Sequence, residues 1–204
     1  MARLLASRLR YLYLDTGALY RAVAWKVLKS GIDQDDRGAI ARMLPSTKLE
    51  MECGPERPRV LVDGQDVTGE LRVPEVSALA SIVSAIPAVR EWLLPVQREI
   101  GAAGSVVAEG RDIGTKVFPG ADVKFFLEAD PEVRAMRRHR ELVAAGHSVH
   151  IDQTKRDMTG RDDRDRTRAV APLQPASDAE RVDTSLLSAD EVVEHMMAVI
   201  TARL

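Results

Sequence analysis

The chain has 204 residues, of which 29 are basic and 31 acidic, so its formal net charge is −2. This balance excludes a globally basic nucleic-acid binder and an acidic solvating tail, and 45% apolar residues exclude a disordered chain. No stretch reaches the ~18 apolar residues of a membrane span. With the single cysteine, Cys53, no internal disulfide can form, and we expect a cytoplasmic protein without membrane contact.

Arginine dominates the basic residues, with 23 Arg against 6 Lys. Arginine is preferred where a phosphate or carboxylate is bound bidentately, but a GC-rich genome also raises arginine throughout a protein. Composition leaves both explanations open, and position along the chain must decide between them.

The first half of the chain predicts helices with a small antiparallel insert. The alternating segments 48–52 and 59–62 predict the strands of that insert, and residues 11–14 predict an earlier strand. Apolar spacing, capping residues and first-turn prolines predict helices beginning at Met1, Asp15 or Thr16, Asp35, Pro74 and Pro87.

The second half alternates strands with helices. Residues 105–108 and 123–127 predict buried strands, and residues 181–184 a last short one. Helices are predicted from Pro131 to about residue 145, over 153–168, and after the capping box of Ser188 and Glu191. The alternation predicts an α/β fold with a mainly parallel, doubly wound sheet.

Two motifs follow predicted strands and carry groups suited to binding an anion. In DTGALYR, Thr16 and Arg21 are placed to face the crevice at the strand ends, although an ordinary capped helix with a surface arginine explains them too. In AEGRDIGT, Arg111 supplies a fork of donors, and Glu109 or Asp112 can orient water or a metal. A charged cluster at the end of a buried strand favours a functional role.

A third motif, GRDDRDRTR, places charged residues on one face of a helix. Between residues 134 and 168, ten cations stand against six carboxylates, a net charge of +4. A solvated face with ion pairs, a movable arm that closes over polyphosphate, and a weak RNA-binding strip all fit this pattern. The residues on the shared face are Arg161, Arg164, Asp165 and Arg168.

Other chemistries have little support in the sequence. One cysteine and four histidines without an HExxH motif argue against zinc, and no Gly-x-Ser-x-Gly elbow is present. Three Phe and three Tyr are too few for a base-stacking platform.

Five motifs together resemble, in order, bacterial cytidylate kinase: YLDTGALYRAVA, VREWLLPVQREI, VVAEGRDIGTKVFPGADVKFFLEA, RDDRDRTRAVAPL and DTSLLSADEVV. The resemblance covers essentially the whole chain. It implies an α/β nucleoside monophosphate kinase of the P-loop type, which transfers the γ-phosphoryl of ATP to CMP or dCMP with Mg²⁺. It also implies a three-layer kinase core (1–46 and 103–204), a nucleotide-binding insert (47–102) and a helical lid (about 134–168), acting as a monomer without nucleic acid.

The resemblance also implies residue roles. Catalytic roles fall to Arg111, Arg161 and Arg164, and Arg137 and Arg138 are lid arginines. The implied substrate-binding residues are Thr16, Arg21, Ser81, Arg111, Arg161, Asp165 and Arg168.

One family motif is missing from the sequence. No G-x-x-x-x-G-K-[ST] loop, which cradles the donor phosphates and helps to bind Mg²⁺, occurs anywhere in the chain, so no residue is assigned to the cofactor or to a metal. We expect that the natural protein starts upstream of Met1 and that the chain lacks a first strand and the P-loop. The expected consequence is no appreciable ATP-dependent phosphorylation of CMP. A catalytically inactive nucleotide-binding relative and an RNA-associated protein are the alternatives.

Overall fold

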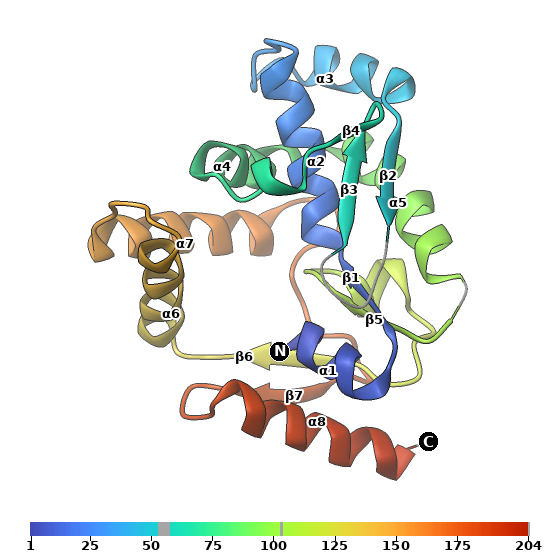
Figure 1. Cartoon of the computed structure of the whole chain (residues 1–204), viewed down its shortest axis with the longest axis vertical. Helices are drawn as coiled ribbons and strands as arrows, with labels where there is room; N and C mark the ends of the chain where they lie inside the picture. Colours follow the sequence, from blue (N-terminus) through green and yellow to red (C-terminus); the bar gives the residue numbers. More distant parts are fainter. Residues whose placement is uncertain (53–57, 103, 204) are drawn as a thin grey trace.

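The computed structural model describes residues 1–52, 58–102 and 104–203, and these form an α/β architecture (Figure 1). The helices are α1 (Ala2–Leu9), α2 (Thr16–Lys29), α3 (Arg37–Met43), α4 (Pro74–Val83), α5 (Pro87–Gly101), α6 (Pro131–Ala144), α7 (Ile151–Thr167) and α8 (Ala189–Arg203). The strands are β1 (Leu12–Asp15), β2 (Leu49–Glu52), β3 (Arg59–Val62), β4 (Gln65–Asp66), β5 (Val106–Glu109), β6 (Phe125–Glu128) and β7 (Glu180–Asp183).

The predicted helix starts are confirmed by their caps. Asp15 accepts a hydrogen bond from the Ala18 amide at 3.1 Å and so caps α2. Before α8, the Ser188 amide donates to Glu191 at 2.8 Å, and the Glu191 amide donates to the Ser188 hydroxyl at 3.2 Å, which is the predicted capping box. The helix α5 continues through Pro95.

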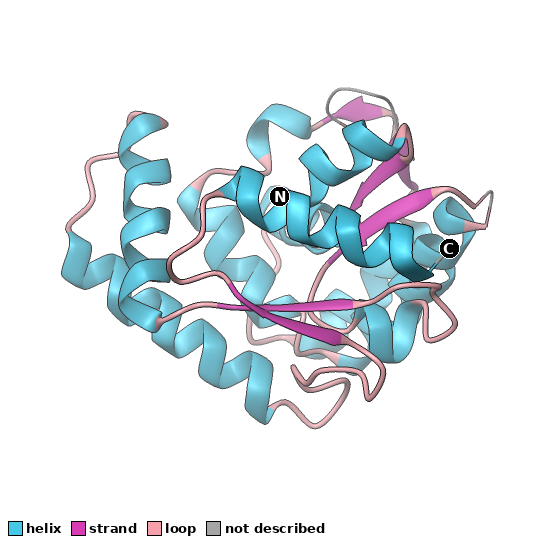
Figure 2. Cartoon of the chain, turned by 90° about the horizontal axis from the view of Figure 1, so that it is seen from below, coloured by secondary structure: helices cyan, strands magenta, loops and turns pink. Residues whose placement is uncertain are grey.

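The predicted α/β fold with parallel strands and covering helices is confirmed, and within the described residues the parallel strands form two hydrogen-bonded pairs. The strand β1 pairs in parallel with β5, and β6 pairs in parallel with β7, while β2, β3 and β4 form the predicted antiparallel insert. The β6–β7 pair stands apart from the remaining strands in Figure 2. No hydrogen-bonded ladder joins β5 to β6 within the described ranges.

This separation corrects the prediction that residues 105–108 and 123–127 are buried strands. Val106, Val107 and Ala108 are only half-buried in β5, and Leu127 in β6 is 37% exposed. The physical reason is that each of these strands has a single paired neighbour among the described residues, so the other edge is left uncovered.

Two apolar clusters hold the elements together. The larger cluster centres on α2 and joins it to α3, β3, α4 and α5, with Leu19 and Val23 essentially inaccessible to solvent. The smaller one joins α1 to α8 through Leu5 and Val192, and Val107 and Phe125 pack against it. The insert therefore packs on α2, and the first and last helices pack on each other.

The helices α6 and α7 project from the rest of the molecule, and α7 runs back toward α2 and α4 (Figure 1). Among the described helices, none alone has the length and apolarity to cross a membrane. The helices α4 and α5 reach that threshold only as a pair bent by 101°.

Candidate active site

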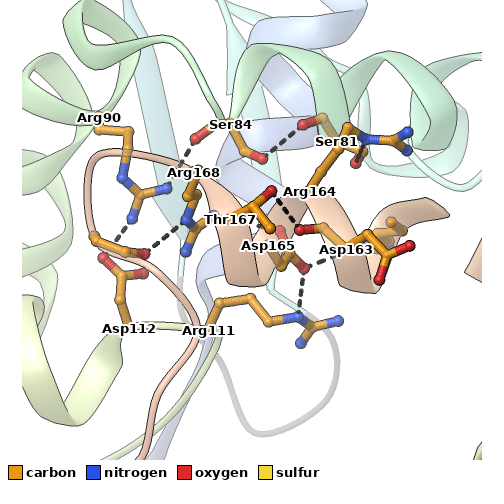
Figure 3. A network of polar contacts seen from close by, with 12 residues as sticks. Ser81, Ser84, Arg90, Arg111, Asp112, Asp163, Arg164, Asp165, Thr167 and Arg168 are labelled. Carbon is orange, nitrogen blue, oxygen red and sulfur yellow. Dashed lines mark hydrogen bonds and ion pairs between the residues drawn. The ribbon is translucent and has the colours of Figure 1, made fainter. Parts of the chain in front are cut away.

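Figure 3 shows predicted site residues from different parts of the chain in one polar network: Ser81, Arg111, Arg164, Asp165 and Arg168. The ends of β1 and β5 lead into α2 and into the loop that carries Arg111 and Asp112. The insert adds the end of α4 and the start of α5, and α7 brings its C-terminal half across them. Motifs that lie more than one hundred residues apart in the sequence therefore share one site.

Asp165 is the centre of an arginine cluster. Its side chain is only 5% exposed, and it accepts a hydrogen bond from Arg111 Nε at 3.1 Å. Arg168 Nη1 lies 3.4 Å from Asp165 Oδ1, and Arg161 Nε lies 4.0 Å from Asp165 Oδ2, the oxygen that Arg111 contacts. One carboxylate thus serves three guanidinium groups, an arrangement that leaves an excess of positive charge.

Burial and the neighbouring positive charges both act on Arg161. Burial, and next the charge of Arg111, lower the pKa of Arg161 to about 10, while Asp165 opposes the shift. Burial is also the main cause that lowers the pKa of Arg168. Within the part of the chain that the structure describes, three buried arginine nitrogens lack a hydrogen-bond acceptor: Arg21 Nε, Arg161 Nε and Arg168 Nη2. Buried donors without acceptors are costly, and an anion would supply the acceptors that these three nitrogens lack.

Thr16 and Arg21 are already engaged at the end of β1. The Thr16 hydroxyl donates to the Glu109 carbonyl at 2.8 Å and so ties the end of β1 to that of β5. Arg21 Nη2 lies 2.6 Å from Asp15 Oδ2. A Cβ at Gly110 would come within 2.3 Å of the Thr16 hydroxyl oxygen, so only glycine fits this close approach.

A second polar group lies between the insert and the Arg111 loop. The side chains of Arg90 and Asp112 form an ion pair, and they are 6% and 8% exposed. Arg90 also donates to the Ser84 carbonyl at 2.9 Å and lies over the Tyr20 ring, 5.3 Å from its centroid. Burial raises the pKa of Tyr20. Asp112 was considered as a group that orients water or a metal, and here its partner is an arginine.

Arg90 is a site residue that the sequence reasoning missed. It lies in α5 at a buried position between the core residues Val89 and Leu93. The available signal was a charged residue at the apolar spacing of an amphipathic helix, which is unusual unless the charge is paired.

Ser81 and Arg164 connect the insert to α7. Arg164 Nε donates to the Ser81 hydroxyl at 3.0 Å, and the Ser84 hydroxyl donates to the Ser81 carbonyl at 2.9 Å (Figure 3). The helix α7, which lies in the predicted lid, is therefore in direct contact with the predicted insert.

The two lid arginines lie in different surroundings. Arg137 donates to the Thr184 hydroxyl at 3.1 Å, to the Thr184 carbonyl at 2.6 Å and to the Leu187 carbonyl at 3.1 Å, so its guanidinium is directed to the loop after β7. Arg138 pairs with Glu141 at 3.2 Å, and its charge contributes to lowering the pKa of Arg161. The structure thus brings Arg138 closer to the arginine cluster and gives Arg137 an anchoring contact.

Among the described residues, no group of three or more His, Cys, Asp or Glu side chains could hold a metal ion. Glu109, a predicted candidate, accepts a hydrogen bond from the Tyr13 hydroxyl at 2.5 Å.

Comparison with known proteins identifies the family. The family model described as cytidylate kinase matches residues 1–202. A cytidylate kinase from Pelotomaculum thermopropionicum is 46% identical over 203 residues, which cover 99% of this chain and 90% of that protein. Those from Carboxydothermus hydrogenoformans (46% over 200 residues; 98% and 90% covered) and Geobacillus kaustophilus (42% over 204 residues; 100% and 91% covered) are similar. The arginine-rich site and these matches together place the chain in the cytidylate kinase family.

Proposed function

We propose that this protein is a nucleoside monophosphate kinase whose arginine cluster binds the phosphate of CMP or dCMP and presents it to the γ-phosphoryl of ATP. The observation that carries the proposal is the surplus of buried arginine donors around the single carboxylate of Asp165. A phosphate dianion supplies the acceptors that these donors lack, and its charge offsets the excess.

The proposal assigns the nucleotide phosphate to Arg21, Arg111 and Arg161. In the present arrangement, Arg21 is paired with Asp15 and Arg111 with Asp165, so each carboxylate holds its arginine near the phosphate position. Asp165 can also accept a hydrogen bond from a sugar hydroxyl, with Arg168 held beside it by the Ala171 carbonyl at 2.6 Å. Thr16 fixes the strand ends from which these groups project.

The polar group formed by the ion pair of Arg90 and Asp112 suits the cytosine ring of the substrate. Cytosine offers an amino donor beside two acceptors, and the Asp112 carboxylate can accept while the guanidinium of Arg90 and the hydroxyl of Ser81 donate. Uracil presents a carbonyl where cytosine has its amino group. A carboxylate facing that carbonyl disfavours UMP, because buried polar groups would be left unpaired.

For phosphoryl transfer, the protein must position the two substrates and neutralise the negative charge of the transferred group. Arg111, Arg161 and Arg164 stabilise the negative charge that spreads over the transferred group, and closure of the lid excludes water. No protein base is required, since the attacking phosphate oxygen carries its own charge. Mg²⁺ bound to ATP supplies charge neutralisation at the donor phosphates.

Binding of the phosphoryl donor, ATP, is the part of the reaction to which no residue of this chain is assigned. Because the sequence contains no P-loop motif, the proposal assigns no residue to the ATP phosphates, and we expect CMP binding to exceed ATP binding. Under this proposal the protein acts as a monomer in the cytoplasm. The carboxylates within its lid oppose the phosphate backbone of a nucleic acid.

Separate calorimetric titrations with CMP, UMP, ATP and a short RNA test the proposal. We expect CMP to bind more tightly than UMP. Arg111→Met should weaken CMP binding about 10-fold or more, because a hydrogen bond to a charged group is lost. The exposed lid residue Arg140 gives a matched control, and Arg140→Met should leave CMP binding unchanged.

An ADP-release assay with CMP and ATP then separates binding from turnover. CMP binding without turnover supports the inactive alternative, and turnover shows that the donor phosphates are held without a P-loop. RNA binding with a steep salt dependence, together with no CMP binding, would refute the proposal.

A further inference from the structure

The lid helix α7 is attached to the molecule through polar side chains. Its buried residues are Thr154, Asp162 and Asp165, and its apolar side chains, such as Met158, are at most half-buried. Apolar packing therefore constrains the rotation of α7 about its own axis only weakly. That rotation decides whether Arg161 faces the proposed phosphate position, so another contact must set it.

The polar contacts of α7 fall into two groups, one inside the proposed nucleotide site and one outside it. In the first group, Asp165 is paired with Arg111 and Arg164 bonds to Ser81. These contacts lie in the proposed nucleotide site, where an incoming phosphate competes with Asp165 for Arg111. They are therefore not constant through a reaction cycle and cannot alone hold the helix in register.

The second group is formed by Arg134 of α6 and its partner Asp162, which lies three residues before Asp165 on α7. Arg134 Nη1 lies 2.6 Å from Asp162 Oδ2, and the side chain of Asp162 is 13% exposed. Arg134 Nε also donates to the Ala129 carbonyl, just beyond the end of β6, at 3.2 Å. One guanidinium thus connects the end of a core strand to α7, one residue away from Arg161 and on a different face of the helix.

We propose that Arg134 is a positioning residue for the proposed kinase reaction, which acts through Asp162 to set the rotation of α7 and so to direct Arg161 at the nucleotide phosphate. This inference rests on the proposed function, since it concerns the phosphate part of that site. Arg134 itself touches no proposed substrate group. Its planar fork is required because it makes two contacts in different directions, which a lysine cannot reproduce.

A second ion pair between the same helices provides a matched control. Lys155 Nζ lies 2.5 Å from Glu132 Oε2, but these side chains are 37% and 70% exposed. A solvent-exposed pair contributes little, so Glu132→Gln should not alter the rotation of α7. A general loosening of the lid would affect both pairs, whereas the proposed positioning depends on Arg134 and Asp162 alone.

The test compares CMP with cytidine, because cytidine lacks the phosphate that Arg161 is proposed to meet. Calorimetric titrations give the ratio of the two affinities for the wild type and for Asp162→Asn, Arg134→Met, Arg134→Lys and Glu132→Gln. We expect Asp162→Asn and Arg134→Met to reduce the CMP-to-cytidine affinity ratio about 10-fold, with cytidine binding itself unchanged. Arg134→Lys should recover part of the loss, and Glu132→Gln should match the wild type.

Several results would overturn the inference. An unchanged ratio in Asp162→Asn, which preserves the shape of the side chain, removes the role of this pair. An equal loss of CMP and cytidine affinity indicates a merely structural contact, as does an equal loss in Glu132→Gln. A wild type that binds CMP no better than cytidine instead refutes the proposed function and this inference with it.

Discussion

The helices α2 and α7 both contribute to the candidate site, but they are held in opposite ways. The 14-residue α2 buries Leu19, Val23 and other apolar side chains in the larger cluster. The 17-residue α7 buries only a threonine and two aspartates, each within reach of polar partners. Apolar burial is non-directional and persists in any ligand state, whereas ion pairs can exchange partners with an incoming anion. The apolar packing of α2 thus stabilises the fold in every ligand state, whereas the ion pairs of α7 can change when an anion binds.

The largest expected effect comes from truncating the core of α2. Leu19 is fully inaccessible to solvent, so Leu19→Ala removes buried methyl groups and leaves a cavity. We expect the free energy of unfolding to fall by about 2–5 kcal/mol, measured by urea denaturation. In α7 the half-buried Met158 gives the comparison, and Met158→Ala should cost less than about 1 kcal/mol. Equal losses would break the contrast between the two helices.

Removing the central carboxylate of the site tests how α7 is held. Asp165→Asn takes the anion away from three arginines, and we expect a loss of about 1–3 kcal/mol in the free energy of unfolding. Replacing chloride by phosphate in the buffer should restore part of this loss, since the anion can take the place of the carboxylate. The exposed neighbour Asp163 is the control, and Asp163→Asn should show neither effect.

A smaller effect of opposite sign is expected at Gly160, in the middle of α7. A Cβ added there would lie 3.6 Å from Arg164 Nη1, an ordinary contact, so Gly160→Ala should stabilise the helix by about 0.5–1 kcal/mol. Slower amide hydrogen exchange confined to α7 would confirm this. At Gly110, where no Cβ fits, Gly110→Ala should destabilise the protein.

The smallest effect concerns the charge of Arg161. Because its pKa is lowered to about 10 in the folded state, chiefly by burial, the charged form costs stability at neutral pH. Arg161→Gln should raise the melting temperature by only about 1–2 °C, because Nε is buried while the side chain as a whole is 42% exposed and keeps part of its hydration. The same variant should weaken CMP binding. The folded state loses this proton first as pH rises above about 10, so the difference in melting temperature should shrink there. A difference that grows above this pH would contradict the assignment.

Local signals in the sequence predicted the elements well. The cap Asp15 and the capping box of Ser188 and Glu191 act within three residues, so they can be recognised in the sequence without tertiary information. Strand burial was predicted wrongly, because it depends on neighbouring strands and not on the apolarity of residues 105–108. Arg90 was missed because its partner, Asp112, lies more than twenty residues away in the sequence. The role of Arg134 could not be predicted because its contact with Asp162 exists only when α6 and α7 are packed together.

The divided sheet has a consequence for the protein in solution. The strands β5 and β6 each carry backbone amides and carbonyls along an edge that no described strand pairs, next to half-exposed valine and leucine side chains. Such edges are templates for strand pairing between molecules, and apolar neighbours strengthen that association. Raising the protein concentration should therefore cause aggregation before heating does. A charged substitution such as Leu127→Lys should raise the highest concentration at which the solution stays free of aggregates.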